Sequence, residues 1–282
     1  MPAKPHQLRT LLILGRVSNL PTVWSNCLAA WLLNGGVLSS KLFLLCTGAT
    51  LLYTGGMFLN DAFDVEFDLR HRSERPIPAG QISARSVWLM GSVLLLAGWL
   101  CLLPLGIPTM LVALLLVTAI LLYDALHKRT PLAPLIMAAC RFLLYLVAAV
   151  GTGNPPGALG VWHGLALAAY IVGLSFLARS ESTGFAVGRW PILLLVAPVV
   201  SNFVLNHSWP LFAWLTSACL SAWIFWCASR RSGGVGRMVA GLLAGIILVD
   251  WSALENPTLA VSAFFAGLFV LALILQRKVP AT

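Results

Sequence analysis

Ten long apolar runs, separated by short polar turns, constrain this chain more than any other feature. A helix needs about 20 apolar residues to cross the roughly 30 Å hydrocarbon core of a bilayer. We therefore predict an all-α, polytopic membrane helical bundle. Every connection is short except 62–86, so we treat 1–282 as a single integral membrane domain. The expected spans are 11–34, 42–62, 86–104, 107–124, 131–151, 161–180, 189–205, 209–228, 236–253 and 257–275.

The composition excludes other classes of protein. The chain is 59% hydrophobic and 10% charged, whereas soluble domains carry roughly 25% charged residues. This apolar content also excludes disorder. The first run is interrupted by Arg16 and Asn19, lacks a clear small-residue cleavage site and continues as a full span, so we do not interpret it as a signal peptide. The six cysteines lie in apolar runs without metal-type spacing and are interpreted as small buried residues.

The basic residues predict an orientation in the membrane. If the N-terminus is cytoplasmic, the opposite side carries only Lys41 among the lysines and arginines of the expected loops. This asymmetry follows the positive-inside rule. The net charge of +9 then indicates topology and contact with membrane lipids, and no nucleic acid partner. We expect an integral protein of a bacterial inner (cytoplasmic) membrane, with both termini and the loop 62–86 in the cytoplasm.

One short segment holds most of the acidic residues. Five of the nine acids fall between positions 61 and 74, within "LNDAFDVEFDLRHRSERPIPAG" at 59–80. At 100° per residue, Asn60, Asp61, Asp64 and Asp68 lie at about 0°, 100°, 40° and 80°, on one face of a helix end. Glu66 falls at about 240°, away from that face.

Three carboxylates and an amide on one face predict a cation site. All-oxygen ligands suit Mg²⁺, which typically keeps several waters and is shared with substrate phosphates. The basic residues beyond the acids, including Arg72 and Arg75, would face the phosphate oxygens. The alternative is a solvated juxtamembrane loop with charges of both signs.

Four segments carry a resemblance to a known family. "NDAFDVEFD" fits an Asn-Asp-x-x-Asp-x-x-x-Asp motif, and "RSERPIPAG" fits its Arg-Pro-hydrophobic-Pro-x-Gly continuation. "GRVSNLPTVWSN" and "LLYDALHKRTP" are similar to the same family. Over about 11–190 the chain resembles the UbiA superfamily of intramembrane prenyltransferases.

The resemblance implies a bundle of about nine helices around a central cavity, with opposite termini. It also implies Mg²⁺ as cofactor, an isoprenyl diphosphate as donor and a lipophilic, often aromatic acceptor. By resemblance, Lys128 and Arg129 would contact the diphosphate. The metal ligands or their supports would be Asn60, Asp61, Asp64 and Asp68.

The family's second aspartate-rich motif is weak in this chain. The corresponding segment reads "GLSFLARSESTG" and offers only Glu181, with Arg179 beside it. Glu181 lies about 200° from Arg179 on an ideal helix, so it can join the site only if the helix ends first, which Gly184 allows. Arg179 could instead supply the positive charge of a second metal.

Polar and aromatic residues within the spans are further candidates. A charge near the bilayer centre costs at least about 2.5 kcal/mol, so we expect Arg141 to face an anionic group of a substrate. The alternative for Arg141 is a structural pair with another helix, such as Asp250. Asn19 is counted with the substrate-binding residues, whereas the side chain of its neighbour Arg16 could merely reach the interface. Aromatic faces that could stabilise an allylic carbocation are Tyr53, Tyr123 and Tyr145.

The leading hypothesis is Mg²⁺-dependent transfer of an isoprenyl group within the membrane. A non-catalytic membrane carrier or assembly factor on the same fold is the alternative, because the second motif is weak. A CDP-alcohol phosphotransferase also uses aspartates at a helix end. Its pattern, however, includes Asp-Gly, which this chain lacks, and Ala178-Arg179 lies far from the aspartates.

Overall fold

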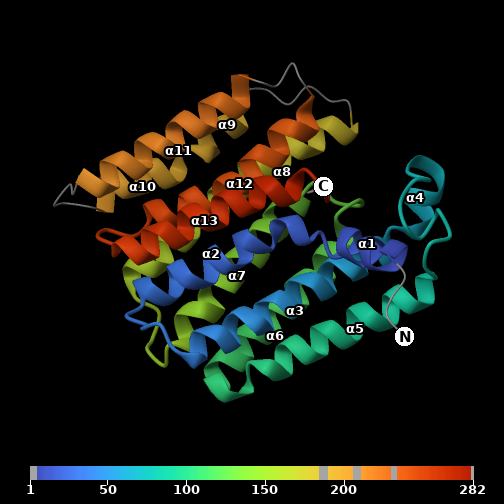
Figure 1. The fold of residues 1–282 in the computed structure, drawn as a ribbon, viewed down its shortest axis with the longest axis horizontal. Coiled ribbons are helices and arrows are strands. Elements are labelled where there is room, and N and C mark those ends of the chain that lie inside the picture. Colours follow the sequence, from blue (N-terminus) through green and yellow to red (C-terminus); the bar gives the residue numbers. More distant parts are fainter. Residues whose placement is uncertain (1–4, 184–189, 206–210, 230–233, 281–282) are drawn as a thin grey trace.

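In the part of the chain that the computed structural model describes, every element of regular secondary structure is a helix (Figure 1). The structure describes the backbone of residues 5–183, 190–205, 211–229 and 234–280. At the edges of these ranges, the side chains of residues 5–6, 180–183 and 205 are not described. The helices are α1 (Pro5–Leu14), η1 (Val17–Asn19), α2 (Leu20–Leu33), α3 (Ser40–Phe63), α4 (Val65–His71), α5 (Ala84–Cys101), η2 (Leu103–Leu105), α6 (Ile107–Leu126), α7 (Ala133–Gly151), α8 (Ala158–Thr183), α9 (Trp190–Leu195), α10 (Ala197–Leu205), α11 (Leu211–Ser229), α12 (Val235–Ser252) and α13 (Leu259–Gln276).

Eight of the described helices are long and apolar enough to cross a membrane. They coincide with eight of the ten expected spans, which confirms the all-α polytopic fold. Each of the other two spans consists of two shorter helices. Segment 11–34 is interrupted between α1 and α2 by the short η1 helix, and segment 189–205 is divided between α9 and α10 at Val196.

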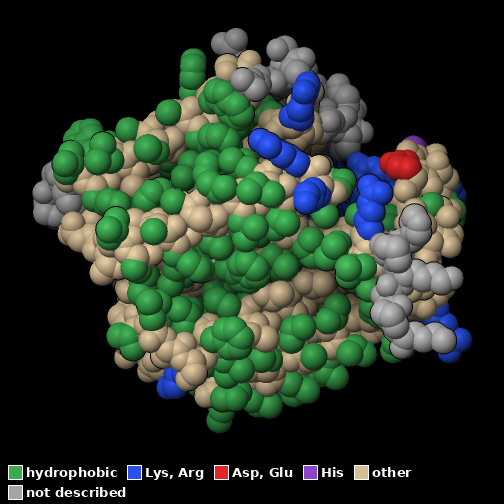
Figure 2. Space-filling view, viewed as in Figure 1, with side chains coloured by type: hydrophobic (Ala, Val, Ile, Leu, Met, Phe, Trp, Pro, Cys, Tyr) green, Lys and Arg blue, Asp and Glu red, His purple; other side chains and the backbone are tan. Residues whose placement is uncertain are grey.

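The two ends of the bundle differ in charge. Hydrophobic side chains cover most of the face in Figure 2, and Lys and Arg side chains gather mainly at the end where α4 lies in Figure 1. Both ends of the described chain also lie toward this end (Figure 1). This placement favours an even number of passes over the nine that the resemblance implies, because an even number of passes returns the chain to the side where it began.

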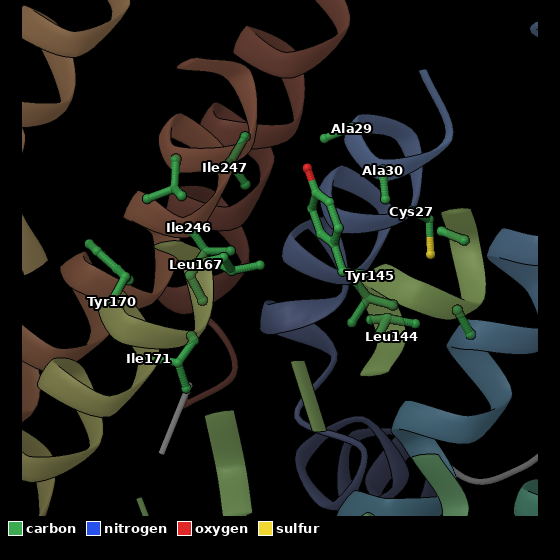
Figure 3. Close-up of a cluster of buried hydrophobic side chains, with 14 of the residues drawn as sticks. Cys27, Ala29, Ala30, Leu144, Tyr145, Leu167, Tyr170, Ile171, Ile246 and Ile247 are labelled. Carbon is green, nitrogen blue, oxygen red and sulfur yellow. The ribbon is translucent and has the colours of Figure 1, made fainter. Parts of the chain in front are cut away.

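The central part of the bundle is formed by α2 and α12, which pack against each other and against α8 and α13. Both helices are buried along most of their length. Figure 3 shows the apolar cluster in which they meet α7 and α8. Its labelled members are Cys27, Ala29, Ala30, Leu144, Tyr145, Leu167, Tyr170, Ile171, Ile246 and Ile247.

Glycines allow α3 and α5 to approach closely along the whole pair. A Cβ atom on Gly55 would lie 2.8 Å from the Leu95 nitrogen and 2.9 Å from the Gly91 oxygen. One end of the pair repeats the arrangement, because a Cβ atom on Gly98 would lie 2.9 Å from the Gly48 oxygen. Such small residues let helix backbones pack directly in a membrane protein. The tight pair holds the acidic end of α3 in place.

Candidate active site at the acidic end of α3

The acidic motif lies where α3 passes into α4. Asp64 separates the two helices, yet the Asp64 nitrogen donates to the Asn60 oxygen at 3.1 Å and the Asp68 nitrogen donates to the Asp64 oxygen at 2.9 Å. The helical repeat therefore continues across the junction, as the motif spacing requires. Asn60, Asp61 and Asp68 are only 3–4% exposed, whereas Glu66 is exposed. The expected division of the motif into two faces is present.

Asp61 is surrounded by arginines from two different segments. Its Oδ1 atom accepts from Arg75 Nη1 at 3.1 Å and from Arg16 Nη2 at 3.3 Å. Arg16 lies between α1 and η1 with a left-handed backbone at φ 41°, which non-glycine residues rarely adopt. This conformation ends α1 and turns the Arg16 side chain into the site.

Asn60 joins this group to α6. Its Nδ2 atom donates to Asp124 Oδ1 at 3.0 Å, and its Oδ1 atom accepts from Arg16 Nη2 at 3.0 Å. A carboxylate requires the amide nitrogen and a guanidinium requires the amide oxygen, so the two neighbours together fix the orientation of the amide. The other carboxylate oxygen of Asp124, Oδ2, is buried without a hydrogen-bond partner.

Asp64 faces the end of α6 and the turn that follows it. Lys128 Nζ lies 2.8 Å from Asp64 Oδ1, and His127 Nε2 lies 3.3 Å from Asp64 Oδ2. The same Lys128 nitrogen lies 3.9 Å from Asp68 Oδ1, an atom that forms no hydrogen bond. Lys128 also lies over the Phe67 ring, 3.6 Å from its centroid.

The pKa values of Asp64 and Asp68 are shifted in opposite directions. Burial acts to raise the pKa of Asp64, but the hydrogen bonds from His127 and Lys128 outweigh it, so the pKa lies below its ordinary value. Burial raises the pKa of Asp68 above its ordinary value despite the positive charges of Arg75 and Lys128. The anionic form of Asp64 is therefore stabilised, and that of Asp68 is incompletely compensated.

A pocket of about 270 Å³ opens beside these residues. It is bounded by α4 on one side and by the end of α6 on the other, which brings the acidic and basic groups to one space. Its lining residues are Phe63, Asp64, Glu66, Phe67, Arg70, His71, Asp124, Ala125, His127, Lys128 and Arg129.

The donor set fits Mg²⁺ chemically, although its carboxylates point toward basic groups. Asn60, Asp61, Asp64 and Asp68 supply oxygen ligands only, and this is the preference of Mg²⁺. Within the described residues, no group of three His, Cys, Asp or Glu side chains is arranged to hold a metal ion. Basic groups contact these carboxylates instead: Arg16 and Arg75 contact Asp61, and Lys128 lies close to Asp64 and Asp68.

The family of the chain follows from comparison with known proteins. The profile of the UbiA prenyltransferase family matches residues 19–234. The chain belongs to this family. A UbiA homolog from Aeropyrum pernix K1 has a TM-score of 0.69 at 17% identity, covering 85% of this chain and 97% of that one. A UbiA homolog from Archaeoglobus fulgidus bound to GPP and Mg²⁺ has a TM-score of 0.55 at 12% identity, covering 96% and 97%. These two likenesses concern the fold.

Curated relatives match over shorter stretches. A digeranylgeranylglyceryl phosphate synthase from Methanothrix thermoacetophila is 35% identical over 126 residues, which is 44% of this chain and 47% of the relative. A 4-hydroxybenzoate octaprenyltransferase from Stutzerimonas stutzeri is 38% identical over 77 residues, 26% of this chain and 25% of the relative. The matched part thus spans less than half of either UbiA-family relative.

The remaining candidate residues lie at different distances from the acidic motif. Tyr123 stacks on His127, with ring centroids 5.0 Å apart, and Arg129 lines the pocket. Arg72 is half-buried at the end of α4.

Arg179 Nη1 donates to the Thr130 oxygen at 2.8 Å, so α8 is tied to the turn that carries the pocket's basic residues. Two further candidates are Asn19, which is buried before α2, and Glu181, whose side chain is outside the described residues.

Arg141 takes part in a separate polar cluster among α2, α7 and α12. It donates from Nη1 to Asn26 Oδ1 at 2.8 Å and from Nη2 to Thr22 Oγ1 at 3.0 Å. Asn26 in turn donates to Asp250 Oδ2 at 2.7 Å, and Ser25 donates to the same oxygen at 2.5 Å. Arg141 and Asp250 are thus linked through Asn26, without a direct ion pair. The Tyr53 ring lies 5.9 Å from the Arg141 guanidinium, whereas Tyr145 belongs to the apolar core.

Three residues of the acidic site were not expected from the sequence in these roles: Arg16, Asp124 and His127. Asp124, His127 and Lys128 are spaced i, i+3 and i+4, and this places them on one side of a helix end. That spacing was the available signal for Asp124 on α6 and for His127 directly after it. Arg16 had no comparable signal, because its contact depends on the bend between α1 and α2.

Proposed function

We propose that this protein transfers an isoprenyl group from an isoprenyl diphosphate to a lipophilic acceptor within the membrane, with Mg²⁺ as cofactor. The observation that carries the proposal is the meeting of an oxygen-rich motif with basic side chains at one end of an apolar bundle. Membership of the UbiA prenyltransferase family supports it. So does the binding of GPP and of DMAPP, each with Mg²⁺, by the Archaeoglobus fulgidus homolog.

In this proposal the acidic motif holds the metal, and the basic residues around it hold the diphosphate. Asn60, Asp61, Asp64 and Asp68 are the candidate ligands. Mg²⁺ would offset the negative charge that develops on the departing diphosphate. Arg72, Arg75, Lys128 and Arg129 are the candidate diphosphate contacts, since charged hydrogen bonds to phosphate oxygens are strong.

The isoprenyl tail would extend from the site into the apolar bundle. The bond between C1 and the diphosphate oxygen breaks, a bond forms between C1 and the acceptor nucleophile, and the acceptor proton passes to solvent. Tyr123, which stacks on His127 beside the pocket, and Tyr53 present ring faces that can stabilise positive charge on the allylic carbons.

The acceptor is the less defined substrate. The names of the curated relatives include an aromatic acid, 4-hydroxybenzoate, and a glyceryl phosphate. Both are anionic, and we assign such an anionic group to Arg141. Asn19, which precedes Thr22 in the first span, is the second candidate contact. Arg141 pairs with neutral oxygens of Thr22 and Asn26 and with no carboxylate in the described part of the chain, so no direct ion pair offsets its charge.

A direct assay tests the proposal. The purified protein in detergent receives radiolabelled isoprenyl diphosphates of several lengths, each with 4-hydroxybenzoate or a glyceryl phosphate, with Mg²⁺ or with EDTA. We expect a labelled lipophilic product or Mg²⁺-dependent release of diphosphate, both lost in Asp64→Asn. Binding of the diphosphate without either reaction would indicate a carrier on the same fold. Mass spectrometry of lipids from cells with and without the protein identifies the natural acceptor.

A further inference from the structure

Lys128 lies where a cation would bridge the carboxylates of Asp64 and Asp68. Its Nζ atom is 2.8 Å from Asp64 Oδ1 and 3.9 Å from Asp68 Oδ1. These two carboxylates belong to the α3–α4 junction and to α4, whereas Lys128 follows α6. A single ammonium therefore reaches across the pocket and compensates acids on the opposite side.

This compensation is incomplete. Asp64 receives a short charged contact, but Asp68 Oδ1 is buried and has no hydrogen bond. Two carboxylates carry two negative charges and one ammonium carries one positive charge. A divalent cation at this position would balance both acids, and buried charges require such pairing.

Lys128 is also the basic group of the site that can leave most easily. Its side chain is 30% exposed, and a lysine has a flexible stem with a compact charge. Its support on the Phe67 ring is worth only about 0.5–1 kcal/mol at an exposed position. Arg16 and Arg75, which hold Asp61, are more buried.

We propose that Lys128 occupies the cation position between Asp64 and Asp68 until a diphosphate draws it away, so that Mg²⁺ and the diphosphate bind as a coupled pair. The inference rests on the proposed function, in which the same lysine contacts the diphosphate. Because coupling is reciprocal, each ligand strengthens the binding of the other by the same factor. Metal alone competes with the ammonium, and diphosphate alone must separate the ammonium from two acids.

The first test measures metal affinity without any diphosphate. Purified wild type, Lys128→Met and Arg70→Met are titrated with Mn²⁺, and free Mn²⁺ is followed by electron paramagnetic resonance. We expect Lys128→Met to bind Mn²⁺ about tenfold more tightly than the wild type, because a competing charged contact is gone. Arg70 is the matched control: it lines the same pocket, is exposed and forms no ion pair among the described residues, so its loss should change the affinity less than about threefold.

The second test adds a non-reactive thio-analogue of geranyl diphosphate at saturation. The analogue should tighten Mn²⁺ binding to the wild type by a factor about ten times larger than its effect on Lys128→Met, in which the diphosphate still attracts the metal but has no ammonium to displace. Unchanged or weaker Mn²⁺ binding by Lys128→Met without diphosphate would overturn the inference, and so would an equal gain in Arg70→Met. If the wild type binds neither Mn²⁺ nor the analogue, the proposed function itself fails.

Discussion

Asp61 and Asp64 both belong to the acidic motif, yet we expect them to contribute differently to the free energy of unfolding. Asp61 is 4% exposed, and its Oδ1 atom receives two guanidinium groups that are themselves 20% and 15% exposed. Removing one partner of a buried ion pair costs about 3–5 kcal/mol. Asparagine keeps an acceptor oxygen and the arginines keep some solvent, so we expect Asp61→Asn to cost about 2–3 kcal/mol.

Asp64→Asn should cost much less. Asp64 is 13% exposed and its main partner, Lys128, is 30% exposed, so the pair resembles a surface ion pair worth about 0.2–1 kcal/mol. The two substitutions are chemically identical and lie three residues apart. Their expected difference of about 2 kcal/mol should appear as a melting temperature roughly 5 °C lower for Asp61→Asn, measured by thermal unfolding in detergent.

Asp61→Asn and Asp64→Asn should bind Mg²⁺ and a diphosphate analogue equally poorly. Each loses a candidate metal ligand, so each should need more than ten times as much Mg²⁺ to bind a diphosphate analogue, and Asp68→Asn should behave in the same way. Glu66→Gln is the matched control, since Glu66 is exposed on the pocket rim. It should match the wild type in stability and in binding. Equal loss in Glu66→Gln, or undiminished binding in all three aspartate variants, would refute the assignment of the metal site.

Three further outcomes are expected. Arg141→Leu should raise the KM for an anionic acceptor more than tenfold; lower thermal stability with an unchanged KM would make Arg141 purely structural. Arg16→Gly should be more stable than Arg16→Ala by about 1 kcal/mol, because glycine adopts the left-handed backbone at φ 41° without strain, and both should bind the diphosphate analogue weakly. A reporter fused after Thr282 should be active on the cytoplasmic side in an even-pass topology, and periplasmic activity would contradict the ten-pass count.

The sequence predicted the bundle well because one physical rule dominates it. Apolar runs of sufficient length must form helices in a membrane, and eight of the ten expected spans are single long helices. The two interrupted spans show what this rule does not predict, namely a break within an apolar run. Arg16 and Asn19 interrupt the apolar run, but the sequence does not show that the backbone of Arg16 is left-handed or that its side chain reaches Asn60 and Asp61.

The acidic site likewise has one part that the sequence predicts and another part that it does not. Asn60, Asp61, Asp64 and Asp68 could be grouped from spacing alone, because one continuous helical repeat carries them. Their partners arrive from the first bend, from the loop after α4 and from the end of α6. Contacts between separate elements depend on how the helices pack, and neither propensity nor periodicity encodes that packing for an individual side chain.

The cluster around Arg141 illustrates a limit of assigning partners by charge. Charge alone suggested either a substrate anion or a direct pair with Asp250, but Asn26 lies between the two ionisable groups. An amide can accept a hydrogen bond through its oxygen and donate through its nitrogen, so one asparagine connects a guanidinium to a carboxylate without the close approach of an ion pair. Asp250 is thereby held by neutral donors from α2, Ser25 and Asn26. Arg141 keeps a charge that no described carboxylate contacts directly, and that charge is what an anionic acceptor would require.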